Sequence, residues 1–191
     1  MSTAPRAKAS DFHPEVMRLF DQYVHGQIDR RAFLAGYVKP GHPVMREVTA
    51  SLQSTTGWDL EASVRERAAA RGLVDQVCER AEDAVAEADL VILCVPVGAM
   101  GEAAQAIAPG LKPNAIISDV GSSKAAVAEA LAAALPGACI IPAHPVAGTE
   151  QSGPEAGFAT LFAGRWCIIT PPEGVDPAAL QALSDFWTAL G

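Results

Sequence analysis

Apolar runs and alanine-rich amphipathic segments alternate along the second half of the chain. Segments such as SKAAVAEALAAAL place Val127, Leu131 and Leu135 on one face of a helix. Strands that alternate with helices predict a parallel sheet with right-handed crossovers. The short, mainly apolar runs that predict buried strands cover residues 88–97, 114–120, 138–141 and 165–170.

A weaker form of the same pattern precedes these strands. It predicts the tail of a strand ending at Asp59, a helix over residues 61–71 and a short strand over residues 74–77. In a doubly wound sheet, an acidic residue at the end of the second strand accepts the ribose hydroxyls of a dinucleotide. An Asp between a strand and a helix is also a common helix N-cap. The order of elements indicates an α/β, Rossmann-like fold, whose core we expect to include Val91, Leu93, Ile116 and Ile140.

The residues before Gly57 depart from the usual start of that fold. A Rossmann domain opens with an apolar strand that runs into G-x-G-x-x-G, so that backbone amides approach the pyrophosphate. This stretch contains Gly36 and Gly41 but neither the fingerprint nor a clear first strand. We therefore expect the first strand and the fingerprint to be atypical or missing. The chain then divides into an N-terminal helical segment, residues 1–40, and an incomplete Rossmann-like domain, residues 41–191.

Composition narrows the class of function. The chain has 191 residues and a formal net charge of -8, which argues against nucleic acid or an acidic membrane surface as a partner. No apolar run approaches the ~20 residues that span a bilayer. The cysteines show no C-x-x-C spacing, so we expect reduced thiols in the core of a cytoplasmic protein, and no metal site. They are Cys78, Cys94, Cys139 and Cys167.

Candidate chemistry follows three consecutive predicted strands, in CVPVGAM, DVGSSK and AHPVAGTE. Ligands of open α/β sheets bind outside the carboxyl ends of the strands, so Pro96, Ser122 and His144 are expected to face one crevice. Pro145 restricts His144 to an extended backbone, and an imidazole ordinarily titrates near neutral pH. Simpler interpretations make Ser122 a helix N-cap and Lys124 a solvated residue of the first helical turn.

These stretches resemble a known family. GWDL, ADLVILCVPVGAM, ISDVGSSK and IPAHPVAGTEQSGPEAGFATLFAGRWCIITP are similar to the prephenate, arogenate and cyclohexadienyl dehydrogenases of tyrosine biosynthesis, over roughly residues 57–191. The run HPVAGTEQSG separates this family from other Rossmann dehydrogenases. The resemblance implies an oxidative decarboxylation, in which a hydride passes from the substrate ring to NAD or NADP and carbon dioxide departs as the ring aromatises. It leaves open whether prephenate or arogenate is the substrate.

The resemblance also implies roles for individual residues. His144 would be the catalytic residue that takes the proton of the 4-hydroxyl, and Ser122 would bond the same region and orient the histidine. Thr149 and Glu150 correspond to substrate-binding loop residues, although by themselves they equally suit a glycine-rich turn. Asp59 would accept ribose hydroxyls and favour NAD over NADP. The nicotinamide side of the cofactor would lie along Val95, Pro96 and Val97.

Members of this family continue into a helical domain that forms a homodimer and supplies an arginine for the substrate carboxylate. This sequence ends at Gly191 without that domain and lacks the glycine fingerprint. We therefore expect the chain to bind NAD weakly and not to turn over prephenate. The alternative is a truncated or rearranged, non-catalytic remnant with weak or no cofactor binding. Titration with NAD and NADP separates the two.

Overall fold

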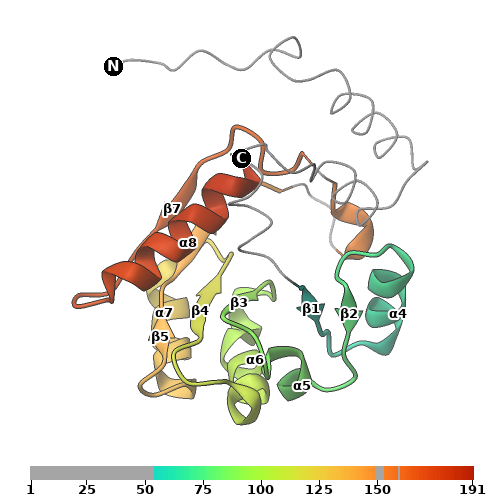
Figure 1. Cartoon of the computed structure of the whole chain (residues 1–191), viewed down its shortest axis with the longest axis horizontal. Helices are drawn as coiled ribbons and strands as arrows, with labels where there is room; N and C mark the ends of the chain where they lie inside the picture. The colour runs from blue at the N-terminus through green and yellow to red at the C-terminus, as the bar shows by residue number, and fades with distance from the viewer. Residues whose placement is uncertain (1–53, 149–152, 159) are drawn as a thin grey trace, which may run out of the picture. The chain divides into compact units, whose positions relative to one another are not determined.

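The structure is a computed structural model that describes residues 54–148, 153–158 and 160–191. The predicted helical segment over residues 1–40, and the boundary after it, lie outside the described residues. The described elements, labelled as in Figure 1, are β1 (Thr56–Gly57), α4 (Ala62–Ala70), β2 (Gln76–Val77), α5 (Ala81–Val85), β3 (Leu90–Leu93), η2 (Val97–Ala99), α6 (Met100–Ile107), η3 (Ala108–Gly110), β4 (Ile116–Asp119), α7 (Lys124–Ala134), β5 (Cys139–Ile140), β6 (Ala143–Pro145), η4 (Pro154–Ala156), β7 (Cys167–Ile169) and α8 (Pro177–Leu190).

Three of the predicted strands form one parallel sheet in the order β3-β4-β5. β3 pairs with β4 from Leu90 opposite Ile116 to Leu93 opposite Asp119, and β4 pairs with β5. Helix α6 connects β3 to β4, and α7 connects β4 to β5. The prediction that residues 88–97, 114–120 and 138–141 supply adjacent parallel strands is therefore confirmed.

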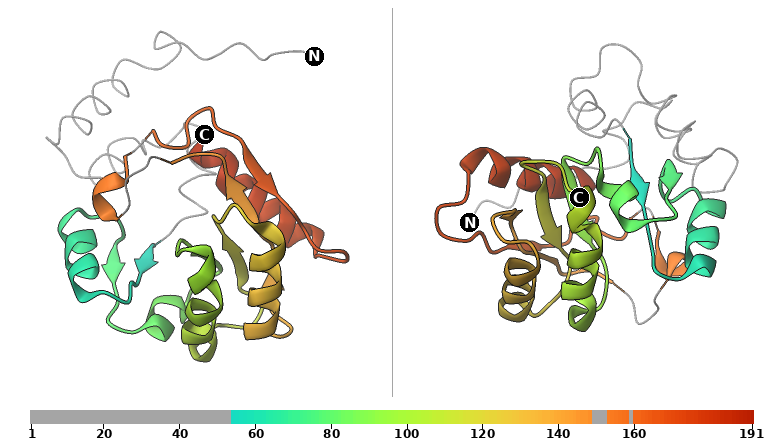
Figure 2. Two further views of the ribbon diagram at one scale, coloured as in Figure 1. Left: turned by 180° about the vertical axis from the view of Figure 1, so that it is seen from behind. Right: turned by 90° about the horizontal axis from the view of Figure 1, so that it is seen from below.

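Helices cover both faces of this sheet (Figures 1 and 2). Val91 and Ile117 belong to one apolar cluster, shared with buried residues of α6 and α7. Leu90 and Ile116 belong to a second cluster, which contains Leu183 of α8. Neighbouring strand residues alternate between the two faces, so the apolar residues of β3 and β4 serve both helix layers.

The expected core is correct for Val91 and Leu93, which are buried. Ile116 and Ile140 are only half-buried, and the fully buried apolar residue of β4 is Ile117. Ile117 faces the side of the sheet that α6 and α7 cover together, whereas Ile116 faces the side where α8 packs. A continuous apolar run does not reveal which of its two faces is more deeply covered.

The fourth predicted strand does not join the parallel sheet. β7, which lies within residues 165–170, pairs antiparallel with β6, with Ala143 opposite Ile169 and Pro145 opposite Cys167. A parallel pairing needs a crossover of a dozen or more residues that is usually a helix, and an antiparallel pairing does not. Among the described residues between β6 and β7, only the short turn η4 is helical. The prediction of a fourth parallel strand was wrong.

β1 and β2 form a separate parallel pair. In the described part of the chain, no strand joins β1 to β3. In the doubly wound order 3-2-1-4-5-6, the first strand, which is followed by the glycine fingerprint, lies between the second and the fourth. The pair β1 and β2 corresponds to the second and third strands of that order, and β3, β4 and β5 correspond to the fourth, fifth and sixth. The fold is therefore Rossmann-like, without a first strand in the described residues.

The cysteines are free thiols, as expected, but they are not all in the core. Cys78 is buried, Cys139 and Cys167 are half-buried, and Cys94, the residue after β3, is exposed. Within the described ranges, no group of acidic, His and Cys side chains is arranged to hold a metal ion. No helix among those residues is long and apolar enough to cross a membrane.

Candidate active site

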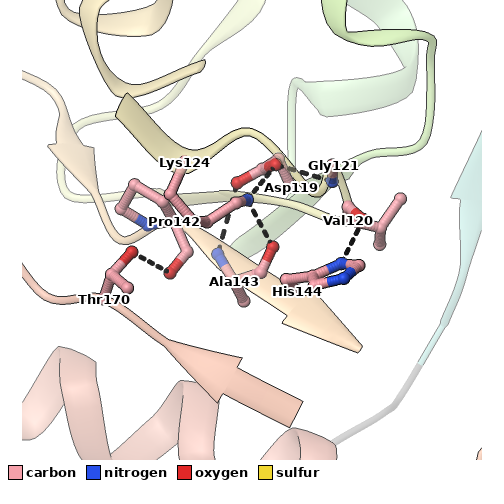
Figure 3. Close-up of polar contacts among 8 residues, drawn as sticks. All are labelled: Asp119, Val120, Gly121, Lys124, Pro142, Ala143, His144 and Thr170. Carbon is pink, nitrogen blue, oxygen red and sulfur yellow. Dashed lines mark hydrogen bonds and ion pairs between the residues drawn. The ribbon is translucent and has the colours of Figure 1, made fainter. Parts of the chain in front are cut away.

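His144 lies in the middle of the short strand β6, rather than at the end of the third strand as predicted. Its ring is half-buried, and Nδ1 is 3.2 Å from the backbone oxygen of Val120, which follows β4 (Figure 3). A carbonyl oxygen can only accept a hydrogen bond, so in the neutral ring Nδ1 carries the proton. Nε2 is then the unprotonated nitrogen that can accept a proton.

A buried carboxylate lies beside this contact. Asp119, the last residue of β4, is 0% exposed. Its Oδ2 accepts a hydrogen bond from Gly121 N at 2.8 Å and is paired with the ammonium of Lys124. Its Oδ1 accepts a hydrogen bond from Ala143 N at 3.2 Å. One side chain therefore connects the end of β4 with the start of β6.

Lys124 is the first residue of α7, and its side chain is 17% exposed. Besides pairing with Asp119, its Nζ donates a hydrogen bond to Ala143 O at 2.6 Å (Figure 3). The interpretation of Lys124 as a solvated first-turn residue was wrong. The sequence contained a signal for this pair, because an Asp at the end of the buried run NAIISD needs a partner.

Ser122 is exposed, and its hydroxyl makes no hydrogen bond within the described residues. Ser123, not Ser122, is the N-cap residue of α7, and it makes no side-chain capping bond. The N-cap interpretation of Ser122 was therefore wrong. Ser122 lies two residues after Val120, whose carbonyl contacts the histidine ring.

The loop that follows β3 meets the loop that follows β4. Pro96 is exposed and caps the turn η2, while Val95 and Val97 pack against the core. A Cβ atom placed on Gly121 would lie 3.2 Å from a methyl group of Val97. Pro96, Ser122 and His144 consequently lie at the same edge of the sheet, where the carboxyl ends of β3 and β4 meet.

Asp59 is half-buried, two residues after β1. Its Oδ1 accepts a hydrogen bond from Glu61 N at 2.9 Å, but the N-cap residue of α4 is Glu61. Arg65 donates to the backbone oxygens of Asp59 and Leu60 and forms an ion pair with Glu79 at 3.0 Å. In the described residues, Oδ2 of Asp59 accepts no hydrogen bond, so it is available to a ligand hydroxyl.

The face of the β6–β7 ribbon that carries His144 is apolar and exposed. Ile168 lies directly opposite His144 and is 51% exposed. Val146 and Trp166 continue the ribbon by one backbone hydrogen bond of 2.7 Å, and both are exposed. Because side chains two residues apart share a face, all three lie on the histidine side. Thr149 and Glu150, predicted to bind substrate, lie outside the described residues.

A groove of about 1150 Å³ lies elsewhere, between α7 and the loop of residues 170–176. Alanine and proline residues form much of its lining, and Lys124 reaches it from the start of α7. His144, Ser122 and Asp59 do not line it. The candidate site is thus an open edge of the sheet, separate from this groove.

The sequence matches two family models. Residues 40–191 match "Prephenate dehydrogenase, nucleotide-binding domain", and residues 4–39 match "YqhI-like". The chain belongs to the prephenate dehydrogenase family. The match to this family begins at residue 40, upstream of residue 57, where the sequence resemblance begins, so it includes the stretch that lacks the fingerprint.

Relatives in the prephenate dehydrogenase family share both sequence and fold with this chain. Cyclohexadienyl dehydrogenase of Zymomonas mobilis is 47% identical over 145 residues, which cover 76% of this chain and 48% of the relative. Arogenate dehydrogenase of Synechocystis is 32% identical, with a TM-score of 0.65, over 71% of this chain and 48% of that one. The chain therefore spans about half the length of these relatives.

A third relative has been solved with ligands. It is prephenate dehydrogenase from Aquifex aeolicus, in complex with hydroxyphenyl propionate and NAD+. This structure is 27% identical to the chain and has a TM-score of 0.66, over 77% of this chain and 54% of that one. The likeness covers about half of a prephenate dehydrogenase that was solved in complex with NAD+.

Proposed function

We propose that this chain is the nucleotide-binding half of an NAD-dependent prephenate or arogenate dehydrogenase, with His144 as the proton acceptor. The orientation of the histidine ring carries the proposal. In the neutral ring, the contact with the carbonyl oxygen of Val120 requires that Nδ1 be the hydrogen-bond donor, so Nε2 is the unprotonated nitrogen. A base in this state is ready to accept a proton from a substrate hydroxyl.

The chain's own residues would supply a base, a hydroxyl group and an apolar surface for the reaction. His144 accepts the 4-hydroxyl proton on Nε2, and the resulting imidazolium keeps its Nδ1 hydrogen bond to Val120 O, which strengthens as the ring becomes positive. Ser122 presents at the same edge a hydroxyl that has no partner in the described ranges, and it can bond the same substrate oxygen. Exposed Ile168 and Trp166 offer apolar contact to a six-membered ring. NAD, when bound, accepts the hydride that leaves this ring.

The residues present fit one end of NAD well. Asp59 has a carboxylate oxygen without a partner in the described residues, which suits a ribose hydroxyl and repels a 2′-phosphate. Arg65 is occupied by two backbone carbonyls and Glu79, so it is not placed to receive that phosphate. Backbone along Val95, Pro96 and Val97 would hold the nicotinamide side. The described residues include no glycine fingerprint for the pyrophosphate, so we expect weak binding.

Isothermal titration of NAD and NADP into the purified chain tests this proposal. We expect NAD to bind more tightly than NADP. Asp59→Asn removes a charge-assisted hydrogen bond worth about 1.5–3 kcal/mol, so NAD affinity should fall roughly ten- to a hundredfold and the preference over NADP should shrink. Asp185→Asn, on the exposed surface of α8, is the matched control and should leave both affinities unchanged. Absence of NAD binding at about millimolar concentration would favour the non-catalytic remnant.

A further inference from the structure

Asp119 and Lys124 hold both peptide groups that flank Ala143, the residue before His144. Asp119 Oδ1 accepts from Ala143 N at 3.2 Å, and Lys124 Nζ donates to Ala143 O at 2.6 Å. The carbonyl that Lys124 binds belongs to the peptide that joins Ala143 to His144. The backbone that carries the histidine is therefore fixed by two side chains from β4 and α7 (Figure 3).

The same carboxylate also holds the other partner of the histidine ring. Asp119 Oδ2 accepts from Gly121 N at 2.8 Å, and this bond closes a turn around Val120. Val120 O is the acceptor for His144 Nδ1. Asp119 thus sets the position of the ring's backbone on one side and of the ring's acceptor on the other.

The charge balance explains why these two residues must act together. Asp119 is fully buried, and an ionised carboxylate in such a place needs a cation and hydrogen-bond donors. Lys124 supplies the cation, and Gly121 N and Ala143 N supply the donors. Without Lys124, Asp119 has an uncompensated charge and Ala143 O loses its donor. Both connections to the histidine would then loosen.

We propose that Asp119 and Lys124 are positioning residues that keep the proton of the neutral His144 ring on Nδ1, so that Nε2 stays available as the base. This inference rests on the proposed function, because it concerns the same histidine. Among the described residues, neither side chain makes a hydrogen bond to the His144 ring. They act by holding His144 and Val120 O at hydrogen-bonding distance, since the bond made by one ring nitrogen decides which nitrogen carries the proton.

Long-range ¹H–¹⁵N NMR of the histidine rings reads this tautomer directly, in the ¹⁵N-labelled chain at roughly pH 9, where imidazoles are ordinarily neutral. His144→Gln identifies the His144 signals by their loss. In the unaltered chain we expect a protonated Nδ1 and a bare Nε2. In Lys124→Met, and in Asp119→Asn combined with Lys124→Met, we expect the signals to shift to a mixture of both tautomers.

Lys112→Met is the matched control, because Lys112 also pairs with an Asp, Asp89 at 2.6 Å, and donates to the backbone oxygen of Glu87. It should leave the His144 signals unchanged. The double variant has no unpaired buried charge, so it keeps the test valid if Lys124→Met fails to fold. A bare Nδ1 in the unaltered chain overturns the proposal without any variant. A single Nδ1-protonated tautomer in the folded double variant overturns it as well.

The tautomer is measured without cofactor or substrate. A chain that fails to bind NAD therefore still shows whether Asp119 and Lys124 orient the ring. Conversely, a ring in the wrong tautomer would leave the NAD titration unaffected, because Asp59 lies after β1 and makes none of these contacts. A negative result in the NAD titration therefore does not imply a negative result in the tautomer measurement, and the reverse also holds.

Discussion

Replacing Lys124 by Met tests how much the ion pair at the end of β4 contributes to the free energy of unfolding. Methionine keeps an unbranched apolar side chain but removes the ammonium, so the carboxylate of Asp119, which is 0% exposed, loses its cationic partner. The Ala143 carbonyl loses its 2.6 Å donor in the same substitution. Removing one partner of a buried pair typically costs 3–5 kcal/mol. Because Lys124 is 17% exposed, we expect the low end, about 3 kcal/mol.

A variant that lacks both charges of the pair gives a second comparison with Lys124→Met. Asp119→Asn combined with Lys124→Met removes both charges and leaves a neutral amide that can still accept one backbone hydrogen bond. Replacing both members of a buried pair usually costs less than breaking it, so the double variant should be more stable than Lys124→Met alone. Lys112→Met should cost at most about 1 kcal/mol, because its partner Asp89 is 92% exposed.

Urea unfolding followed by tryptophan fluorescence and circular dichroism gives these free energies, with the slope checked for two-state behaviour. A loss of about 3 kcal/mol should lower Tm by roughly 10 °C in a domain of this size. Two results would refute the reasoning. One is a Lys124→Met variant as stable as Lys112→Met, which would mean that water reaches Asp119 freely. The other is a double variant less stable than Lys124→Met, which would mean that the lost hydrogen bonds outweigh the uncompensated charge.

Two further predictions concern packing and pH. A Cβ at Gly110 would lie 2.7 Å from Glu82 Cα, so Gly110→Ala should cost about 3 kcal/mol. A Cβ at Gly98 would meet no described atom within 4 Å beyond its own stretch of chain, so Gly98→Ala should cost under about 1 kcal/mol. Equal urea midpoints for the two variants would contradict this. Burial raises the pKa of the Cys139 and Cys167 thiols, so the unfolded chain loses these protons first. Stability should therefore fall as pH rises above about 8.5, and less steeply after both cysteines become alanine; unchanged slopes would contradict this.

Much of the sheet follows from the sequence because its signals are local. The apolar runs that form β3, β4 and β5 are separated by segments long enough for helical crossovers, so their parallel order was predictable. Helix α8 begins where Asp176 and Pro177 signal a helix start, and Asp176 accepts from Ala178 N at 3.0 Å. The motif HPVAGTE was specific enough to indicate the family to which the chain belongs.

Other features were decided only by the tertiary structure. The burial of Ile117 rather than Ile116 depends on which helices cover each face of the sheet. The order of apolar residues in the strand does not predict this. The antiparallel pairing of β7 with β6 depends on the course of the chain between them.

The polar contacts at the candidate site join residues far apart in the chain. Ala143 lies 19 residues from Lys124 and 24 from Asp119, and His144 lies 24 from Val120. The sequence supplied the chemical groups, including the histidine held extended before a proline. The fold alone decided that Asp119 and Lys124 would both meet Ala143. Such pairings arise from packing of the sheet and have no signature in local propensity, because helix and strand periodicity describe only residues a few positions apart.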